Sequence, residues 1–399
     1  MRIPMLKDKL ALFLIIFPFT WMVSGQFVFE NGDKILVIVT LIALVTILLK
    51  YGFAPFKNNL KNNYYIYLLI AFSFISIIYN YFYNSDIINI RSALCVILYF
   101  LFIPLNVIST RVIAYSTFIG SIGAASFAFW QKNILHLDRA AWQLNAIPYA
   151  TCCLILMISA IMFSIIYKDK KETLIISILS GVISFYAIIL TDSRGVLIAA
   201  FAIFLCLLLY VLTTKISLKI KITTITILVV ITTLGIYTTK DRLIHETRQG
   251  LSQYEQGNYL SNTASRLAMW KAGLLLIPQK PITGFGDEFE PAIEKLYQEK
   301  KISSQLYNLK LPHFHNQFID ITVKHGVIGL VLLLLFLLFP YYILQKTQCS
   351  KETKFAILLL TIGIVVSGLT DVPLEFKQVF TLFTVFTYIF LKNKSPTSV

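Results

Sequence analysis

Two histidines that lie close together are the residues best suited to acid–base chemistry in this chain. They flank one phenylalanine in Pro312-His313-Phe314-His315-Asn316, directly before a long apolar stretch. Histidine is the side chain best matched to taking a proton near neutral pH. In an extended segment both imidazoles would point to one side, whereas in a helix they would diverge by about 200°. An ordinary loop role is the alternative to catalysis.

We expect His315 to be the general base, because it stands beside Asn316 at the entry to a rigid helix that can fix the imidazole. His313 would be a second or substitute group, and Asn316 would position the substrate or the loop. This choice between the histidines is a preference. The rival bases are Glu246, Asp287 and Glu290.

Arg194 is the first residue that could bind a phosphate group. It belongs to Asp192-Ser193-Arg194-Gly195, between two apolar stretches that almost no loop separates. Its charge would lie at or below the outer membrane surface, where an unpaired charge is costly and usually functional. Asp192 could instead simply neutralise it. Arg139, in the external segment 136–142, is a further basic site of the same kind.

Arg266 is the second such residue, and it lies on a predicted helix. Asn262 or Thr263 can cap this helix at its start, and Pro278 ends it. One face would lie on the outer leaflet, with Trp270 toward the acyl chains and Arg266 at the headgroup phosphates. Arg266 could also only snorkel to the interface. The face comprises Arg266, Trp270, Leu274 and Ile277.

The elements that must hold these residues are membrane helices. Of the 399 residues, 57% are hydrophobic and 14% are charged, so a water-soluble core could not bury the apolar surface. The first apolar run follows a basic start, but without a convincing cleavage site we interpret it as an uncleaved span. We predict an all-α integral membrane protein with about twelve transmembrane helices. They lie near residues 10–25, 35–49, 64–80, 92–108, 112–130, 147–167, 173–190, 195–213, 222–238, 317–344, 355–370 and 374–391.

The charge pattern predicts the orientation of these spans. With the N-terminus in the cytoplasm, the cytoplasmic segments contain 18 of the 35 Lys and Arg residues but only four acidic ones. This is the positive-inside bias, so both termini are expected in the cytoplasm. The basic residues are scattered over short connections, which argues against nucleic-acid binding. No Cys/His cluster has zinc-ligand spacing, and we expect neither metal nor cofactor.

One long segment interrupts the spans and divides the chain. Residues 1–238 would contain spans one to nine, residues 239–316 a periplasmic loop domain, and residues 317–399 the last three spans and a cytoplasmic tail. The loop has ten basic and eight acidic residues, a mixture typical of a folded cap. Loops of this length are usually functional. Within it Gly284 and Gly286 predict a tight turn, with a backbone anion site as the less common alternative.

The order of these motifs resembles the O-antigen ligase and polymerase superfamily. The series is Ser193-Arg194-Gly195, Ser265-Arg266-x-x-x-Trp270, Pro281-x-x-Gly284-x-Gly286, His313-x-His315-Asn316-x-Phe318 and Gly326-x-x-Gly329. The layout of twelve spans with one large external loop before the tenth is similar to the ligase branch. Motif content is concentrated in residues 192–195 and 262–329.

This resemblance implies a function and a fold. Superfamily members transfer a glycan from undecaprenyl diphosphate to an acceptor in the outer leaflet, which for ligases is a sugar hydroxyl of lipid A–core. The essential arginines would fall on Arg194 and Arg266, and the essential histidine on His315 or His313. The fold would be like the C-type glycosyltransferases and the outcome inverting. Membrane lipids, the lipid-linked O-antigen and lipid A–core are the expected partners, and Trp270, Asn316 and Arg139 the further substrate-binding residues.

The chemistry of such a donor agrees with these residues. The diphosphate already activates the glycan, so no nucleotide-binding motif is needed. Two fixed arginines can stabilise the departing diphosphate without a metal. Two alternatives stay open. One is a polysaccharide polymerase of the same superfamily, whose acceptor is a second lipid-linked repeat, and the other is a lipid or sugar transporter.

Overall fold

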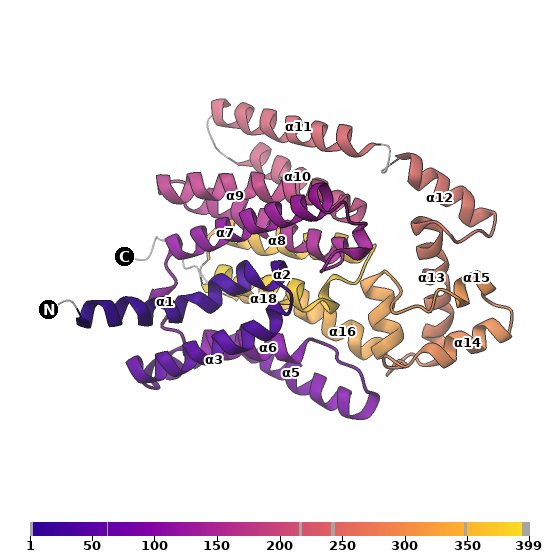
Figure 1. Ribbon diagram of the computed structural model, residues 1–399, viewed down its shortest axis with the longest axis horizontal. Coiled ribbons are helices and arrows are strands. Elements are labelled where there is room, and N and C mark those ends of the chain that lie inside the picture. The colour runs from indigo at the N-terminus through magenta and orange to yellow at the C-terminus, as the bar shows by residue number, and fades with distance from the viewer. Residues whose placement is uncertain (1–2, 62, 215–217, 241–243, 347–348, 393–399) are drawn as a thin grey trace.

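The computed structural model describes residues 3–61, 63–214, 218–240, 244–346 and 349–392. Within these ranges all regular secondary structure is helical. In Figure 1 the long helices lie side by side, and a group of shorter helices gathers at the end of the bundle away from the start of α1. The all-α architecture predicted above is therefore observed.

A helix occupies most of each of the twelve predicted spans. Among the described residues, seven of these helices are long and apolar enough to cross a membrane: α3, α5, α7 with its following turn, α8, α9, α10 and α16. The protein is thus a multi-pass membrane protein, and the count of twelve spans stays a prediction. The helices are α1 (Ile3–Val23), α3 (Gly32–Tyr51), α5 (Tyr64–Tyr83), α6 (Ile90–Phe102), α7 (Thr110–Phe129), α8 (Ala146–Ile166), α9 (Lys171–Leu190), α10 (Arg194–Thr213), α11 (Leu218–Lys240), α16 (Gln317–Lys346), α17 (Lys351–Gly368) and α18 (Lys377–Lys392).

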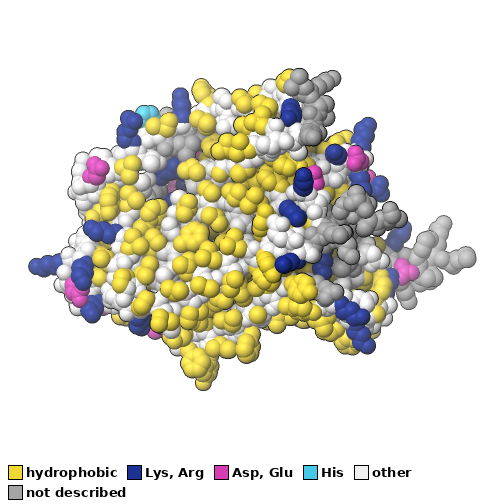
Figure 2. Space-filling view, turned by 180° about the vertical axis from the view of Figure 1, so that it is seen from behind, with side chains coloured by type: hydrophobic (Ala, Val, Ile, Leu, Met, Phe, Trp, Pro, Cys, Tyr) yellow, Lys and Arg dark blue, Asp and Glu magenta, His cyan; other side chains and the backbone are white. Residues whose placement is uncertain are grey.

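Helix α8 lies at the centre of the bundle. Its sequence is apolar on every side, and nearly every residue from Ala146 to Phe163 is buried against α7, α9, α10, α17 and α18. A helix that is hydrophobic all round is one that other helices enclose. Figure 2 shows the outer counterpart, where hydrophobic side chains cover the middle of one face and charged side chains gather toward its two ends. Such a belt suits a hydrocarbon surrounding.

One predicted span is too long. The stretch 92–108 was expected to be a single helix, but α6 ends at Phe102 and α7 begins at Thr110. Pro104 lies between them, and proline has no backbone N–H and fixes its own φ. The short turn η1 (Leu105–Val107) follows it. Other short elements are α2 (Gly25–Val28), α4 (Ala54–Leu60), η2 (Trp130–Ile134), η3 (Arg139–Ala141), η5 (Ile277–Gln279) and η6 (Pro373–Glu375).

The long segment before α16 folds as a small helical cap. It contains α12 (Glu246–Glu255), α13 (Asn262–Leu276), α14 (Glu290–Gln298) and α15 (Ser304–Tyr307). The cap has a hydrophobic core of its own, centred on Ala272, Leu276, Phe289, Leu296 and Phe314. The predicted helix is confirmed as α13, but the predicted cap residue is wrong. Ser261 caps it, its side chain accepting from the Ala264 N–H.

The glycine turn attaches this cap to the bundle. Gly284 and Gly326 both have positive φ, at 67° and 62°, and Gly326 kinks α16. A Cβ on Gly284 would overlap the Lys324 carbonyl, and one on Gly326 would overlap the Ile282 carbonyl, so the two backbones meet. The Gly286 N–H donates to the Lys324 carbonyl at 2.8 Å. The turn interpretation is therefore confirmed, because that N–H already has a protein partner.

Candidate active site at one end of the bundle

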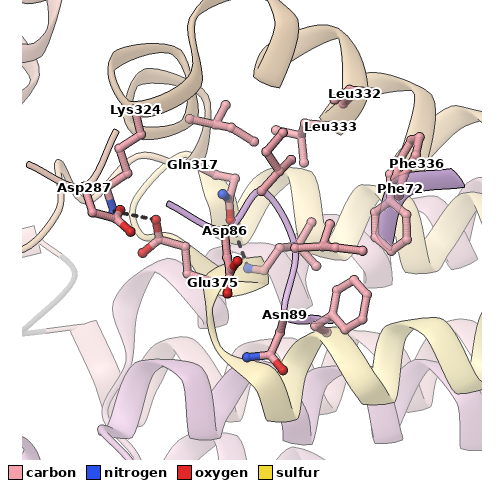
Figure 3. A pocket seen from close by; sticks show the side chains of 15 residues that line it. Phe72, Asp86, Asn89, Asp287, Gln317, Lys324, Leu332, Leu333, Phe336 and Glu375 are labelled. Carbon is pink, nitrogen blue, oxygen red and sulfur yellow. Dashed lines mark hydrogen bonds and ion pairs between the residues drawn. The ribbon is translucent and has the colours of Figure 1, made fainter. Parts of the chain in front are cut away.

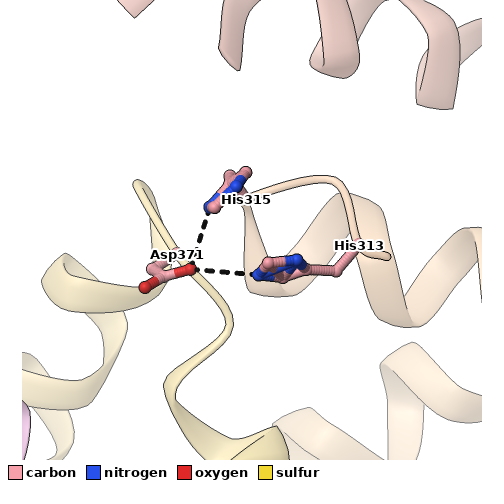
Figure 4. Close-up of side chains that lie close together, drawn as sticks. All are labelled: His313, His315 and Asp371. Carbon is pink, nitrogen blue, oxygen red and sulfur yellow. Dashed lines mark hydrogen bonds and ion pairs between the residues drawn. The ribbon is translucent and has the colours of Figure 1, made fainter. Parts of the chain in front are cut away.

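His313 and His315 converge on one carboxylate. Asp371, from the turn between α17 and α18, has its Oδ1 3.1 Å from His315 Nδ1 and 3.5 Å from His313 Nε2. Figure 4 shows both imidazoles pointing at this oxygen from the segment that leads into α16. The two rings lie 4.1 Å apart between centroids. Of the two arrangements considered from sequence, the one with both imidazoles on one side is observed.

The turn that carries the histidines is held by hydrogen bonds with α13, with the end of α17 and within the start of α16. His315 has a left-handed backbone with φ of 48°, and the Trp270 indole N–H donates to its carbonyl at 3.2 Å. The Asn316 side chain caps α16 by accepting from the N–H groups of Phe318 and Ile319. Its amide also donates to the Leu369 carbonyl at 3.1 Å. Trp270 and Asn316, predicted to contact substrate, thus both have partners that position the histidine turn.

A buried ion-pair network connects this turn to the Asp371 turn. The Phe314 N–H donates to Asp320 at 2.9 Å, and Asp320 lies 3.1 Å from Lys324 one helical turn later. Lys324 also donates to Glu375 at 2.7 Å, four residues beyond Asp371. Lys324 therefore connects the turn that carries the histidines to the turn that carries Asp371.

The charge states at neutral pH follow from burial and neighbouring charges. Burial and the charge of His315 lower the pKa of His313 to about 4, so this imidazole is neutral. Burial alone would raise the pKa of Asp371. The hydrogen bond from His315 and the charges of His315 and Arg266 outweigh burial, and the pKa of Asp371 lies below its usual value. When His315 is neutral, its Nδ1–H donates to the ionised Asp371, which leaves Nε2 as the proton acceptor of that ring.

Arg266 lies within electrostatic reach of both Asp371 and Arg194. Burial lowers the pKa of its guanidinium, the charge of Asp371 raises it, and the charge of Arg194 lowers it further. Arginine stays protonated in any case. Its neighbour Trp270 contacts the histidine turn. Arg266 and Trp270 are both partly exposed and also approach the histidine turn, so contact of this face of α13 with lipid stays a prediction. The apolar periodicity indicated a covered face but could not say what covers it.

Arg194 reaches the same region because Gly195 allows a close approach. A Cβ at Gly195 would overlap the Thr370 side chain, so only glycine lets the start of α10 pack against the turn that carries Asp371. Arg194 Nη1 donates to Thr247 at 3.3 Å and lies 3.8 Å from a Glu246 carboxylate oxygen. Glu246, one of the rival bases, is thus a neighbour of Arg194.

The turn before Arg194 is braced by the segment that follows α7. Lys132 pairs with Asp192 at 2.6 Å. The Arg139 guanidinium donates to the Thr191 carbonyl at 2.7 Å and to Ser193 Oγ at 3.0 Å. Arg139, a predicted substrate contact, therefore holds the backbone on which Arg194 stands.

His313, His315 and Asp371 also have ligand types that a metal ion uses, with the candidate atoms within 4.8 Å of one another. The surrounding charges oppose a divalent cation at this place. Asp371 already faces the charge of Arg266, and Arg266 in turn faces Arg194. Like charges at close range disfavour one another. The arrangement suits an anion next to the arginines and a proton acceptor at His315.

Asp371 is the functional candidate that the sequence analysis missed. The sequence did contain a hint of this role. Thr370-Asp371-Val372 lies in a short connection between two predicted spans, and this connection is expected on the same side of the membrane as Arg194. An acidic residue at such a boundary is costly unless it has a partner. Of the rival bases, Asp287 lies 3.6 Å from Lys324 and Glu290 is exposed in the first turn of α14.

Comparisons with known proteins agree with these residues. Residues 179–334 match the family model described as O-antigen ligase, a range that includes Arg194, Arg266 and both histidines but not Asp371. The O-antigen ligase of Escherichia coli is 23% identical over 263 residues, 65% of this chain and 61% of that protein. An uncharacterized protein of Haemophilus influenzae is 30% identical over 118 residues, 29% of each chain. The chain thus matches less than two thirds of the length of either relative. Residues 179–334 therefore resemble the O-antigen ligase family, whose members are glycosyltransferase-like enzymes, and this resemblance covers less than half of the chain.

Proposed function

We propose that this protein is an O-antigen ligase of the bacterial inner membrane. It transfers O-antigen polysaccharide from undecaprenyl diphosphate to a sugar of lipid A–core on the periplasmic side. The observation that carries the proposal is the approach of Arg194 and Arg266 to the histidines around Asp371, at one end of a membrane bundle. The O-antigen ligase match over 179–334 supports the substrate class.

Arg194 and Arg266 are proposed to bind the diphosphate of the donor. Their mutual repulsion in a largely buried position is relieved when an anion lies between them. Charge on the diphosphate grows as the glycosidic bond breaks, so fixed guanidinium groups stabilise the transition state more than the ground state. In this proposal the anion takes the place beside Arg194 that Glu246 and Thr247 have in the structure.

His315 is proposed to be the general base. The acceptor hydroxyl oxygen attacks the anomeric carbon while the bond to the diphosphate oxygen breaks, which inverts the configuration. The hydroxyl proton moves to His315 Nε2, and the negative Asp371 stabilises the resulting imidazolium through Nδ1–H. His315 has the more accessible side chain of the two histidines, 25% exposed against 15% for His313. No metal is required in this scheme.

The orientation of the bundle follows from the same proposal. The site and the helices α12–α15 lie at the end of the bundle away from the start of α1 (Figure 1). With twelve spans, both termini would be cytoplasmic, and residues 239–316 would be the periplasmic domain. The active site would then face the periplasm, where the lipid-linked donor and lipid A–core are expected to meet.

Lipopolysaccharide electrophoresis of a deletion strain tests the proposal. A ligase mutant keeps undecaprenyl-linked polymer but loses all O-antigen bands from lipid A–core. A polymerase mutant instead keeps a single repeat on core, and a transporter mutant accumulates substrate on the cytoplasmic side. Complementation with the wild-type chain should restore the ladder. An unchanged ladder in the deletion strain would refute both the ligase and the polymerase assignments.

A further inference from the structure

An amphipathic cavity lies on the α5 side of the turn that carries Asp371. Its volume is about 230 Å³, and it lies between α5, α16, α18 and the loop that joins α5 to α6. Figure 3 shows its two parts, with Asp86, Asp287, Lys324 and Glu375 at one end and Phe72, Leu333 and Phe336 at the other. Neither histidine lines it.

The shape of the cavity fits a chain and not a ring. Lys324 and Phe336 line the same cavity although twelve residues of α16 separate them. From Val327, just after the kink at Gly326, to Phe336 the helix alone extends about 14 Å at 1.5 Å per residue. The cavity is therefore slender, and it runs along the helices from a polar to an apolar end. The apolar end offers only side chains such as Phe72 and Leu333, so a hydroxyl-rich sugar would lose its hydrogen bonds there.

The polar end carries an excess of negative charge. Lys324 is its only cation among the described lining residues, and it is already shared by Glu375 at 2.7 Å, Asp320 at 3.1 Å and Asp287 at 3.6 Å. Asp86, which is exposed at the mouth, has no ion pair with a described residue. Partial burial of its carboxyl group and the charge of Asp287 raise the pKa of Asp86, against a hydrogen bond with Asn80 that lowers it. A phosphate group alone would be repelled here, whereas an ammonium would be attracted.

We propose that this cavity binds one lipid whose head group carries a primary ammonium, with the ammonium at Asp86 and Asp287 and an acyl chain along Phe72, Leu333 and Phe336. The polarity of the cavity runs parallel to the helix axes, as a lipid of the surrounding leaflet does. An apolar cavity left empty costs the packing of its lining, so a chain that fills it stabilises the bundle. This lipid site is distinct from the proposed diphosphate site at Arg194 and Arg266, which would bind a group of the opposite charge. The lipid proposal does not depend on glycan transfer.

Lipid retention by the purified full chain tests this proposal. The protein is reconstituted in bilayers with equal amounts of phosphatidylethanolamine and phosphatidylglycerol, extracted in mild detergent, and its bound lipid is identified by native mass spectrometry. We expect the wild type to retain one phosphatidylethanolamine, preferred about 1.4- to fivefold, the range expected for a partly exposed ion pair. Equal retention of the two lipids by the wild type would overturn the proposal, and this comparison needs no variant.

Two matched pairs of variants locate the lipid. Leu333→Trp fills the cavity and should abolish retention, whereas Leu334→Trp, on the same helix but 41% exposed, should retain lipid like the wild type. Asp86→Asn combined with Asp287→Asn should remove the head-group preference without removing the chain, and Asp138→Asn, exposed in another loop, should not. Retention by Leu333→Trp equal to that of Leu334→Trp would show that the lipid lies elsewhere and would refute the site.

Discussion

Replacing Asp371 by asparagine tests the candidate site most directly. The amide has the size of the carboxylate, so the buried position, 3% exposed, stays filled. It loses the negative charge that faces His315 at 3.1 Å and Arg266. It also presents an N–H where His315 Nδ1 donates, which favours the tautomer with its proton on Nε2. That tautomer cannot accept a proton from the acceptor hydroxyl.

The two effects predict different magnitudes. Loss of the charged hydrogen bond alone is worth ~1.5–3 kcal/mol, or about 10- to 150-fold in rate. Loss of the base by the change of tautomer costs about 10²–10⁴-fold. We therefore expect kcat for transfer from undecaprenyl-linked donor to lipid A–core to fall at least tenfold, with KM for the donor changed much less.

Purified variants in detergent or nanodiscs measure this effect, with Asp138→Asn as the control for the same chemical change at an exposed position. The double variant Asp371→Asn/His315→Ala should be little worse than His315→Ala, because two residues that act as one unit do not add. A normal kcat for Asp371→Asn, or additive losses in the double variant, would refute the proposal that His315 and Asp371 act as one unit. An active wild type in the same assay separates that outcome from a failure of the ligase proposal.

Further predictions follow from the same geometry. Arg194→Lys and Arg266→Lys keep the positive charge but lose the planar guanidinium, so each variant should lose most transfer activity while still inserting into the membrane. Arg248→Lys, at an exposed position, should keep its activity. A wild-type lipopolysaccharide ladder from either of the first two variants would leave that arginine only a structural role. His315→Ala should lower turnover with little change in donor binding, and His313→Ala should be milder. Because the pKa of His313 is held near 4, His313→Gln should leave the shape of the pH–rate profile between about pH 5 and 8 unchanged. An inactive His313→Ala variant beside an active His315→Ala variant would exchange the roles of the two histidines. A metal chelator should leave transfer intact, and a loss that Mg²⁺ or Zn²⁺ restores would make His313, His315 and Asp371 a metal site. A phosphatase fused near Gly257 should be active and one near Lys170 inactive, and the reverse would overturn the orientation of every span.

The helices, and the residue types that could do chemistry, could be predicted from the sequence because local rules decide them. A backbone in hydrocarbon must satisfy its own hydrogen bonds, so each long apolar run becomes a helix. Helix ends depend on caps and prolines, which is why Pro104 shortened one predicted span and Ser261 replaced Asn262 as a cap. Each superfamily motif is short, and it was the order and spacing of the motifs together that led to the predictions for Arg194, Arg266 and the two histidines.

The partners of those residues were decided by the tertiary structure alone. His315 meets Asp371 across 56 positions, and Arg266 comes within reach of Arg194 across 72, distances over which no local pattern carries information. Gly195 permits the start of α10, which carries Arg194, to pack against Thr370 beside Asp371, and the kink at Gly326 places the glycine turn. Helical periodicity identified the covered face of α13 but not the histidine turn that covers it. Which side chain neutralises or orients another depends on helix packing, and packing depends on all helices at once.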